Sequence, residues 1–185
     1  MRGVNSRKEK YYYDEPFACV AQKQSKRTSR RYFEASFKCQ HCGVLINADP
    51  LLSGVQNRNH CPYCLWSRHV DLYQAGDRLC ACRADMRPMG LTLKQSRNKY
   101  TQQAGELMLV HQCEGCDAFS INRVAADDIA DWIVDCYQVS LSITEADRQT
   151  LLSQGITLLG RADDFLLMRR LFGMEKEKPI DNFPI

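Results

Sequence analysis

The sequence predicts a small α+β fold in which zinc-ribbon-like β-hairpins bind two metal ions and are followed by C-terminal helices. Two observations lead to this prediction. Apolar and polar residues alternate around short cysteine pairs, as in strands, and apolar residues recur at helical spacing after residue 125. Of ten cysteines in 185 residues, eight form such pairs: Cys39 and Cys42, Cys61 and Cys64, Cys80 and Cys82, Cys113 and Cys116.

The cysteine usage indicates a reducing compartment. No N-terminal segment combines a charged start, an apolar run and a small-residue cleavage site, so we expect reduced, metal-binding thiols in the cytoplasm. The chain is 44% hydrophobic, as in globular proteins. No apolar run approaches the roughly 20 residues that span a bilayer. We therefore expect no membrane segment.

The sequence predicts that residues 1–31 form a basic, flexible arm. This segment holds nine Lys and Arg residues against three acidic ones, although the net charge of the whole chain is only +3. Together with Tyr11, Tyr12 and Tyr13, the arm suits a polyanion through phosphate neutralisation and base stacking. Its candidate nucleic-acid contacts are Arg27, Arg30 and Arg31. The alternative is a solvated tail that keeps the protein soluble.

Ordered structure is expected from residue 32. Residues 33–47 alternate around the first cysteine pair, which predicts two short strands meeting at a metal-bound turn, and a loop follows at 49–57. The second pair lies in the segment 57–64. The spacing C-x2-C-x18-C-x2-C is that of a zinc ribbon, with iron as in rubredoxin as the alternative. The predicted ligands are Cys39, Cys42, Cys61 and Cys64.

A second metal site is predicted beyond a hairpin. The apolar segments 89–93 and 106–110 flank a polar turn at 95–105, and the second segment leads to another C-x2-C pair. Cys82, Cys113 and Cys116 are the predicted ligands. The spacing Cys80-x-Cys82 is too tight for both thiolates to reach one metal comfortably, which leaves open whether both are ligands. The sequence therefore leaves three alternatives for the fourth ligand: Cys80, His69 and His60. Two Zn²⁺ ions are expected in total.

The sequences after two of the pairs resemble each other. GVLIN follows Cys42, and DAFSIN follows Cys116. This similarity indicates that one structural unit has been used twice.

The sequence predicts a helical extension over residues 125–173. The apolar face of the segment 125–138 recurs at helical spacing, and Asp127, Asp128 and Asp131 suit its N-terminal end. The pattern Ser142-x2-Glu145 predicts a capping box that starts a second helix ending at Gly155. A third helix is expected over 162–172, before Gly173. Residues 174–185 are charged and then interrupted by proline, which predicts an extended tail.

Several motifs together resemble the RNHCP domain family over residues 33–130. The longest is NRNHCPYCLWSRHVD at 57–71; the others are CxxCG at 39–43, GDR at 76–78, Cys82 with Met86 and Pro88, and the run from Cys113 through NRVAADD to Asp128. The resemblance implies a cysteine-rich, zinc-binding module, here residues 32–124, with no activity established for the family. It also implies that Cys82 is the expected cysteine and Cys80 an addition, which favours His69 or His60 as fourth ligand.

Two features depart from that family pattern. Asp117 stands where the pattern usually has glycine, and the basic arm and the C-terminal helices lie outside it. These flanking segments are candidates for functions specific to this protein.

The predicted function is non-enzymatic RNA binding, with ribosomal RNA or the ribosome as a target. Its candidate contacts beside the cysteines are Arg58, Asn59, His60, Arg68, Asn122 and Arg123, although the same side chains would also suit structural roles around the metal turns. One alternative is a metal-dependent hydrolase or nuclease using His60 and His69 at an open zinc position. Another is an adaptor that binds a protein through the helices after residue 125. A small-molecule substrate is not expected.

Overall fold

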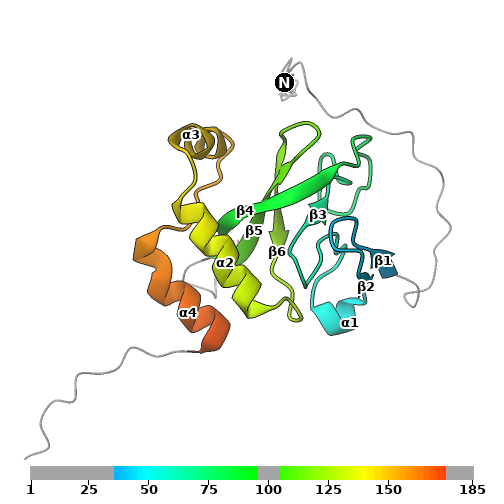
Figure 1. The fold of residues 1–185 in the computed structure, drawn as a ribbon, viewed down its shortest axis with the longest axis horizontal. Coiled ribbons are helices and arrows are strands. Elements are labelled where there is room, and N and C mark those ends of the chain that lie inside the picture. The colour runs from blue at the N-terminus through cyan, green and yellow to red at the C-terminus, as the bar shows by residue number, and fades with distance from the viewer. Residues whose placement is uncertain (1–35, 96–104, 174–185) are drawn as a thin grey trace, which may run out of the picture.

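A computed structural model describes residues 36–95 and 105–173 of the chain (Figure 1). It confirms a small α+β fold with two antiparallel sheets and C-terminal helices. The strands are β1 (Ser36–Lys38), β2 (Leu45–Asn47), β3 (Ser67–Arg68), β4 (Asp85–Lys94), β5 (Glu106–Cys113) and β6 (Phe119–Arg123). The helices are α1 (Pro50–Ser53), α2 (Ala130–Leu141), α3 (Glu145–Ser153) and α4 (Asp164–Phe172), with a short 3-10 helix, η1 (Arg161–Asp163), before α4. The predicted arm and tail, with Arg27, Arg30 and Arg31, lie outside the described residues.

The β1–β2 hairpin has a very small apolar core. Its strands pair antiparallel with Phe37 opposite Ile46, and the first cysteine pair forms the turn between them. Ile46 is 2% exposed and packs against the thiols of Cys39 and Cys61. So few apolar side chains cannot stabilise a hairpin of this size without a further cross-link.

The main sheet is covered on both faces. Its strand order is β3-β4-β5-β6, and the predicted hairpin is present as β4 and β5, with Leu91 opposite Leu109. Five consecutive residues of β5, 107–111, are buried. Because side chains alternate between the two faces of a strand, such a run requires packing on both sides.

Helix α2 covers one face of the sheet, where it crosses β4 and β5 (Figure 1). On this side Ile133, Cys136 and Tyr137 of α2 join Leu91 and Leu109 in the larger core cluster. On the opposite side, Met89 and Val110 pack against Leu151 of α3 and Leu158. The Leu159 N–H also donates to the Leu91 carbonyl at 2.8 Å, which attaches the segment after α3 to β4.

The predicted helices are present, but two of their starts differ. Helix α2 begins at Ala130, so Asp127 and Asp128 precede it and only Asp131 lies in its first turn. The predicted capping box is wrong, because Ser142 ends α2 and Thr144 caps α3 by accepting the Asp147 N–H at 3.1 Å.

Helix α4 ends as predicted. Gly173 adopts φ 67°, the left-handed conformation of a helix C-cap, and its N–H bonds to the Arg169 carbonyl. Within residues 36–95 and 105–173, no helix has the length and apolar character that crossing a bilayer requires.

The packing of α2 on β4 gives a stability prediction. Gly90, at a register shift in β4, has φ 154°, and a Cβ there would lie 2.4 Å from Ser140 Cβ. We expect Gly90→Ala to lower the free energy of unfolding by about 1–3 kcal/mol, measured by urea denaturation with circular dichroism. Gly160→Ala is the matched control, since no atom lies within 4 Å of its added Cβ. Equal stability of the two variants would contradict this close packing.

Candidate metal centres and the adjoining groove

Four thiols meet between the β1–β2 turn and the turn that precedes β3. The Sγ atoms of Cys39, Cys42, Cys61 and Cys64 all lie within 4.8 Å of one another. The two contacts at 3.7 Å (Cys39–Cys64) and 3.6 Å (Cys42–Cys61) each join one turn to the other. Tetrahedral zinc with bonds of about 2.3 Å separates its sulfurs by about 3.8 Å, whereas a disulfide needs about 2.05 Å. The spacing therefore fits a four-thiolate metal site.

The first cysteine turn owes its shape to backbone hydrogen bonds. The Cys39 N–H donates to the Val44 carbonyl at 2.9 Å, and the Gly43 N–H donates to the Cys39 carbonyl at 3.0 Å. Gly43 adopts φ 77°, which glycine accepts without a steric cost. This turn directs both thiols to the same side.

Two further cysteine turns repeat this geometry without glycine. The N–H groups of Cys61 and Cys113 make the corresponding bonds at 2.9 Å, and the fifth residues, Leu65 and Asp117, have φ 59° and 55°. Aspartate tolerates the left-handed region, which explains how Asp117 stands where the family pattern has glycine. Leu65 is 1% exposed in the main core, so its burial offsets the backbone strain.

The second cluster combines three thiols with one imidazole. His69 follows β3, Cys82 precedes β4, Cys113 ends β5 and Cys116 lies in the turn before β6. The ligand atoms of these four residues are all within 4.8 Å of one another. The Sγ atoms of Cys82 and Cys113 are 3.6 Å apart, and Cys116 Sγ lies 3.2 Å from His69 Nδ1. The cluster thus has the donors of a three-thiolate, one-imidazole site.

The other two candidates for its fourth ligand lie elsewhere. Cys80 is fully buried and disulfide-bonded, so the expectation of reduced thiols is wrong for this residue, and its sulfur does not belong to the group of ligand atoms around Cys82. His60 Nε2 lies 2.9 Å from an Asp128 carboxylate oxygen. Of the three alternatives, the geometry brings His69 to the site.

Burial keeps most of the clustered thiols protonated in the absence of a cation. Desolvation raises the pKa of Cys61 to about 11 and that of Cys113 to about 12, and it also raises the pKa of Cys64 and Cys116. A metal binds thiolates, so occupation of these sites must release protons.

Each cluster contains one thiol whose pKa is lowered. A backbone hydrogen bond from Val44 lowers the pKa of Cys42. For Cys82 burial acts to raise the pKa, but hydrogen bonds from Ala84 and the neighbouring thiols outweigh it and lower the pKa. Burial lowers the pKa of His69, so its imidazole is neutral, as a metal ligand must be.

These donor sets are consistent with zinc. Both consist of soft sulfur donors, with one imidazole in the second cluster, and neither contains the oxygen ligands that calcium and magnesium prefer. Four protein donors complete a tetrahedron, as in structural rather than catalytic zinc sites.

A buried ionic network removes two of the predicted nucleic-acid contacts from the surface. The Arg58 guanidinium, 0% exposed, pairs with Asp127 at 2.5 Å and with the buried Asp128 at 2.6 Å. Asp128 also accepts from the Ala125 N–H at 2.7 Å and bonds to His60. The prediction that Arg58 and His60 contact nucleic acid is therefore wrong, because both side chains are buried and engaged.

The structure separates the two histidines, His60 and His69, that the hydrolase alternative requires at one zinc site. His60 belongs to the network with Asp128, whereas His69 belongs to the second cluster. In the part of the chain that the structure describes, no site combines the two.

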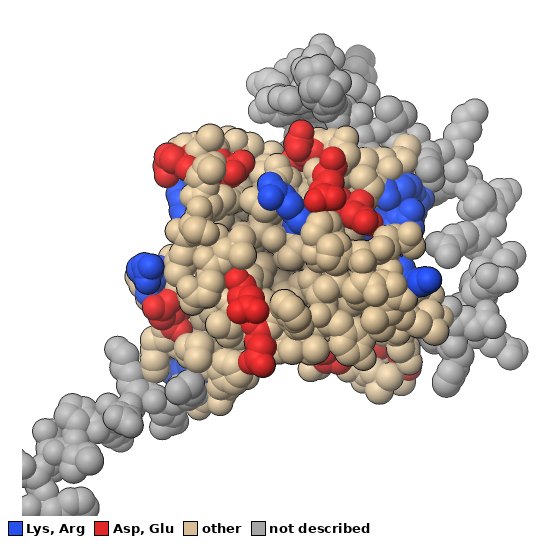
Figure 2. Space-filling view, in the orientation of Figure 1, with Lys and Arg blue, Asp and Glu red and all other residues tan. Residues whose placement is uncertain are grey.

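The remaining predicted contacts are more accessible. Asn59, Arg68 and Asn122 line one groove, while Arg123 is exposed and pairs with Glu106 at 3.1 Å. Basic and acidic side chains are interspersed on the face drawn in Figure 2, so a polyanion would be bound locally rather than across that face.

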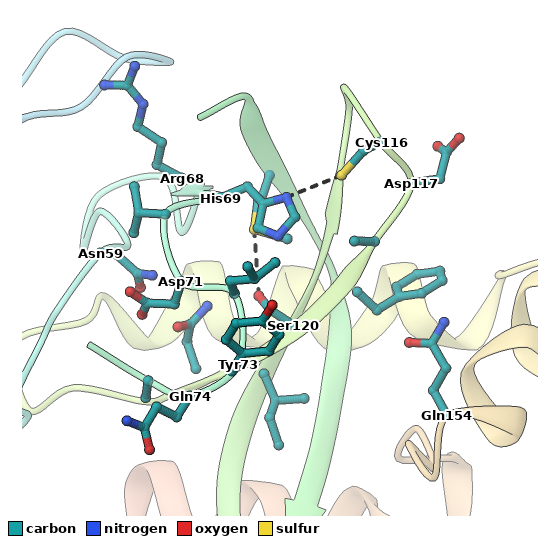
Figure 3. Close-up of a pocket in the computed structure, with 18 of the residues that line it drawn as sticks. Asn59, Arg68, His69, Asp71, Tyr73, Gln74, Cys116, Asp117, Ser120 and Gln154 are labelled. Carbon is teal, nitrogen blue, oxygen red and sulfur yellow. Dashed lines mark hydrogen bonds between the residues drawn. The ribbon is translucent and has the colours of Figure 1, made fainter. Parts of the chain in front are cut away.

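This groove, of about 1140 Å³, lies between the segment 68–75 and β6 (Figure 3). His69 and Cys116 of the second cluster form part of its wall. The sequence interpretation missed Tyr73, which lines the groove and is 78% exposed. The family motif GDR, three residues further along, was the signal that could have indicated it.

The GDR motif holds this loop rigid. Asp77 accepts the N–H groups of Leu72, Tyr73, Gln74 and Leu79 at 2.9–3.1 Å. Burial acts to raise the pKa of Asp77, but these bonds outweigh it and lower the pKa to about 2. Asp71 accepts from the N–H groups of Gly76 and Arg78. At Gly76, φ is 88°, which is strained for any other residue, and an added Cβ would displace the Asn57 side chain 2.4 Å away.

The two clusters predict a metal content. The purified protein should hold two metal ions per chain, and His69→Ala and Cys116→Ala should each retain one after gel filtration in a weak chelator. Elemental mass spectrometry would measure this content and separate zinc from iron. Cys136→Ala, at a free cysteine outside both clusters, is the control and should retain both ions. Two ions retained in His69→Ala would exclude His69 as a ligand.

The buried network predicts a large effect on stability. Arg58→Met leaves the Asp128 carboxylate buried without its cation, so we expect the free energy of unfolding to fall by about 3–5 kcal/mol. Arg123→Met is the control at an exposed pair and should change it by less than about 1 kcal/mol. Denaturation of both variants with their metals bound gives the comparison. Similar losses would show that the Arg58 pair is solvated in solution.

A family model described as RNHCP domain matches residues 34–134, which confirms the resemblance in the sequence. The searches of curated proteins and of solved structures gave no match. The matched range includes both metal clusters and both sides of the Arg58–Asp128 network. Since it covers more than half of the chain, this protein belongs to the RNHCP domain family.

Proposed function

We propose that this protein is a zinc-binding, non-enzymatic RNA-binding protein of the cytoplasm. The observation that carries the proposal is the groove beside the second cluster, where Asn59, Arg68 and Asn122 come together. A guanidinium group suits phosphate, and amide groups suit base edges. Single-stranded RNA presents both, and it is the form of RNA that proteins read by sequence. Ribosomal RNA is a candidate target.

The proposed role of zinc is to hold the binding loops in place. With two ions bound, β1–β2 and the cysteine turns act as zinc-ribbon-like units, whose metals replace an apolar core. Four protein donors at each cluster leave no coordination position for substrate or water, which supports a structural role.

The arginine of the groove lining, Arg68, supports phosphate binding. Arg68 Nε donates to the Arg83 carbonyl at 2.9 Å, and Arg83 donates to the Arg78 carbonyl at 3.1 Å. The neutral Arg83 carbonyl orients the Arg68 guanidinium without cancelling its charge. Arg68 is exposed and forms no ion pair within residues 36–95 and 105–173.

Protein binding is the second candidate function. Helix α2 exposes Trp132 (47%) and Val139 (49%), and α4 exposes Phe172 (45%). Exposed large apolar side chains on adjacent helices support an adaptor role.

RNA binding is tested with the full chain and a labelled single-stranded RNA. We expect the dissociation constant, measured by fluorescence anisotropy, to rise with salt because bound phosphates release counterions. Arg68→Gln should weaken binding and reduce the slope of log K against log salt by about 0.7. Arg161→Gln, an exposed arginine on η1, is the control and should leave the slope unchanged.

The contrary outcomes are distinct. Absence of salt-sensitive binding to RNA or ribosomes at low ionic strength would remove the proposal. Recovery of one protein partner from nuclease-treated extract, lost in Trp132→Ala, would favour the adaptor instead.

A further inference from the structure

We infer that the groove between the segment 68–75 and β6 binds one unpaired adenine of an RNA strand, stacked on Tyr73 and hydrogen-bonded by Asn122. This inference rests on the proposed function and specifies its site. Figure 3 shows Tyr73 within the groove, with Asn59 and Asp71 on one side and Ser120 and Asp117 on the other.

Tyr73 is a preorganised stacking platform. Its ring is 78% exposed, so it contributes little to the core. Its backbone is nevertheless fixed, because its N–H bonds to Asp77 at 2.9 Å and the same carboxylate holds its two neighbours. An exposed ring on a rigid loop can stack on a base without paying the cost of ordering the loop.

The Asn122 amide is oriented by the buried His111. His111 Nε2 lies 2.7 Å from the Leu65 carbonyl oxygen, which only accepts, so Nε2 carries the proton. Nδ1 then accepts from Asn122 Nδ2 at 3.0 Å. This bond fixes which end of the amide is nitrogen and leaves one N–H and the Oδ1 atom available from β6.

That pair of groups matches the edge of adenine. An asparagine amide can donate to N7 of adenine and accept from its N6 amino group at the same time. Guanine presents an acceptor, O6, at the position of that amino group, and pyrimidines have no N7. The fixed amide therefore favours adenine over the other three bases.

The charged groups around the groove are compatible with a neutral base bound inside the groove and a phosphate bound at the edge of the groove. The carboxylate of Asp71 is engaged by Gly76 and Arg78, and Asp117 is exposed on the cysteine turn next to Cys116. The basic group of the lining is the exposed Arg68. A neutral base avoids the carboxylates, while its phosphate can lie near Arg68.

The second cluster of candidate metal ligands forms part of the wall of the groove. His69 and Cys116 line the groove and are also candidate ligands. A base bound there covers these two residues, so RNA should slow the release of one of the two metal ions to a chelator.

The test uses the full chain and a single-stranded oligoadenylate. Base–aromatic stacking predicts that Tyr73→Ala weakens binding by about 5- to 150-fold, while Tyr73→Phe keeps the ring and should bind as the wild type does. Tyr63→Ala is the matched control: Tyr63 is also exposed but lies in the first cluster's turn, outside the groove lining. An oligomer containing 7-deazaadenine lacks N7 and should bind about 2- to 12-fold more weakly. Metal content of each variant, measured in parallel, verifies the fold.

Each result either supports or overturns the inference. Weaker binding in Tyr73→Ala alone, together with the 7-deaza effect and slower metal release, supports it. Salt-dependent RNA binding that is unchanged in Tyr73→Ala overturns the adenine site and leaves the proposed function intact. Equal binding of adenine and 7-deazaadenine oligomers overturns the role of Asn122. Absence of any RNA binding overturns the proposed function, and the adenine site with it.

Discussion

The Asp128 carboxylate is the contact on which the arrangement of this protein depends. It forms an ion pair with Arg58, bonds to His60 Nε2 and accepts a hydrogen bond from the Ala125 N–H. His60 directly precedes the second cysteine turn, and the first residue ahead of α2, Ile129, donates its N–H to the Pro62 carbonyl in that turn. One buried anion therefore attaches the first metal cluster to the start of the helix that covers the main sheet. A buried carboxylate without its cation is costly, so these parts are stable only together.

Sequence reasoning succeeded where the signal was local. The cysteine spacings, the hairpin of β4 and β5 and the cap at Gly173 each depend on residues a few positions apart, whose geometry follows from turn and strand rules. Sequence reasoning failed where the role of a charged residue depends on a partner far away in the chain. Asp127 and Asp128 suited a helix N-terminus, but they pair with Arg58, 69 and 70 positions earlier in the chain. No periodicity reveals such a pairing, because charge alone does not specify its partner.

Tyr73 and Asn122 show the same limit at the groove. Asn122 was recognised as a candidate contact from its position near a cysteine turn, but the sequence does not indicate that His111 would orient its amide. Tyr73 lies in a segment without periodicity, and only the hydrogen bonds to Asp77 turn that segment into a rigid wall. The composition of a site can be predicted from sequence motifs, whereas the direction of its donors and acceptors requires the fold.

The two clusters of candidate metal ligands lie in different physical surroundings. This difference indicates that metal ions bound there would have different roles. Around the first, the buried apolar residue beside the thiols is Ile46, so little besides metal binding can offset the entropy of ordering the β1–β2 hairpin. The second lies at the end of β4 and β5, which already share two apolar cores with α2 and α3. An ion bound there would be needed less for folding the sheet than for holding His69 and Cys116 in the wall of the groove. In this arrangement a metal at the first site would stabilise the protein, and one at the second would shape the surface that we propose binds RNA.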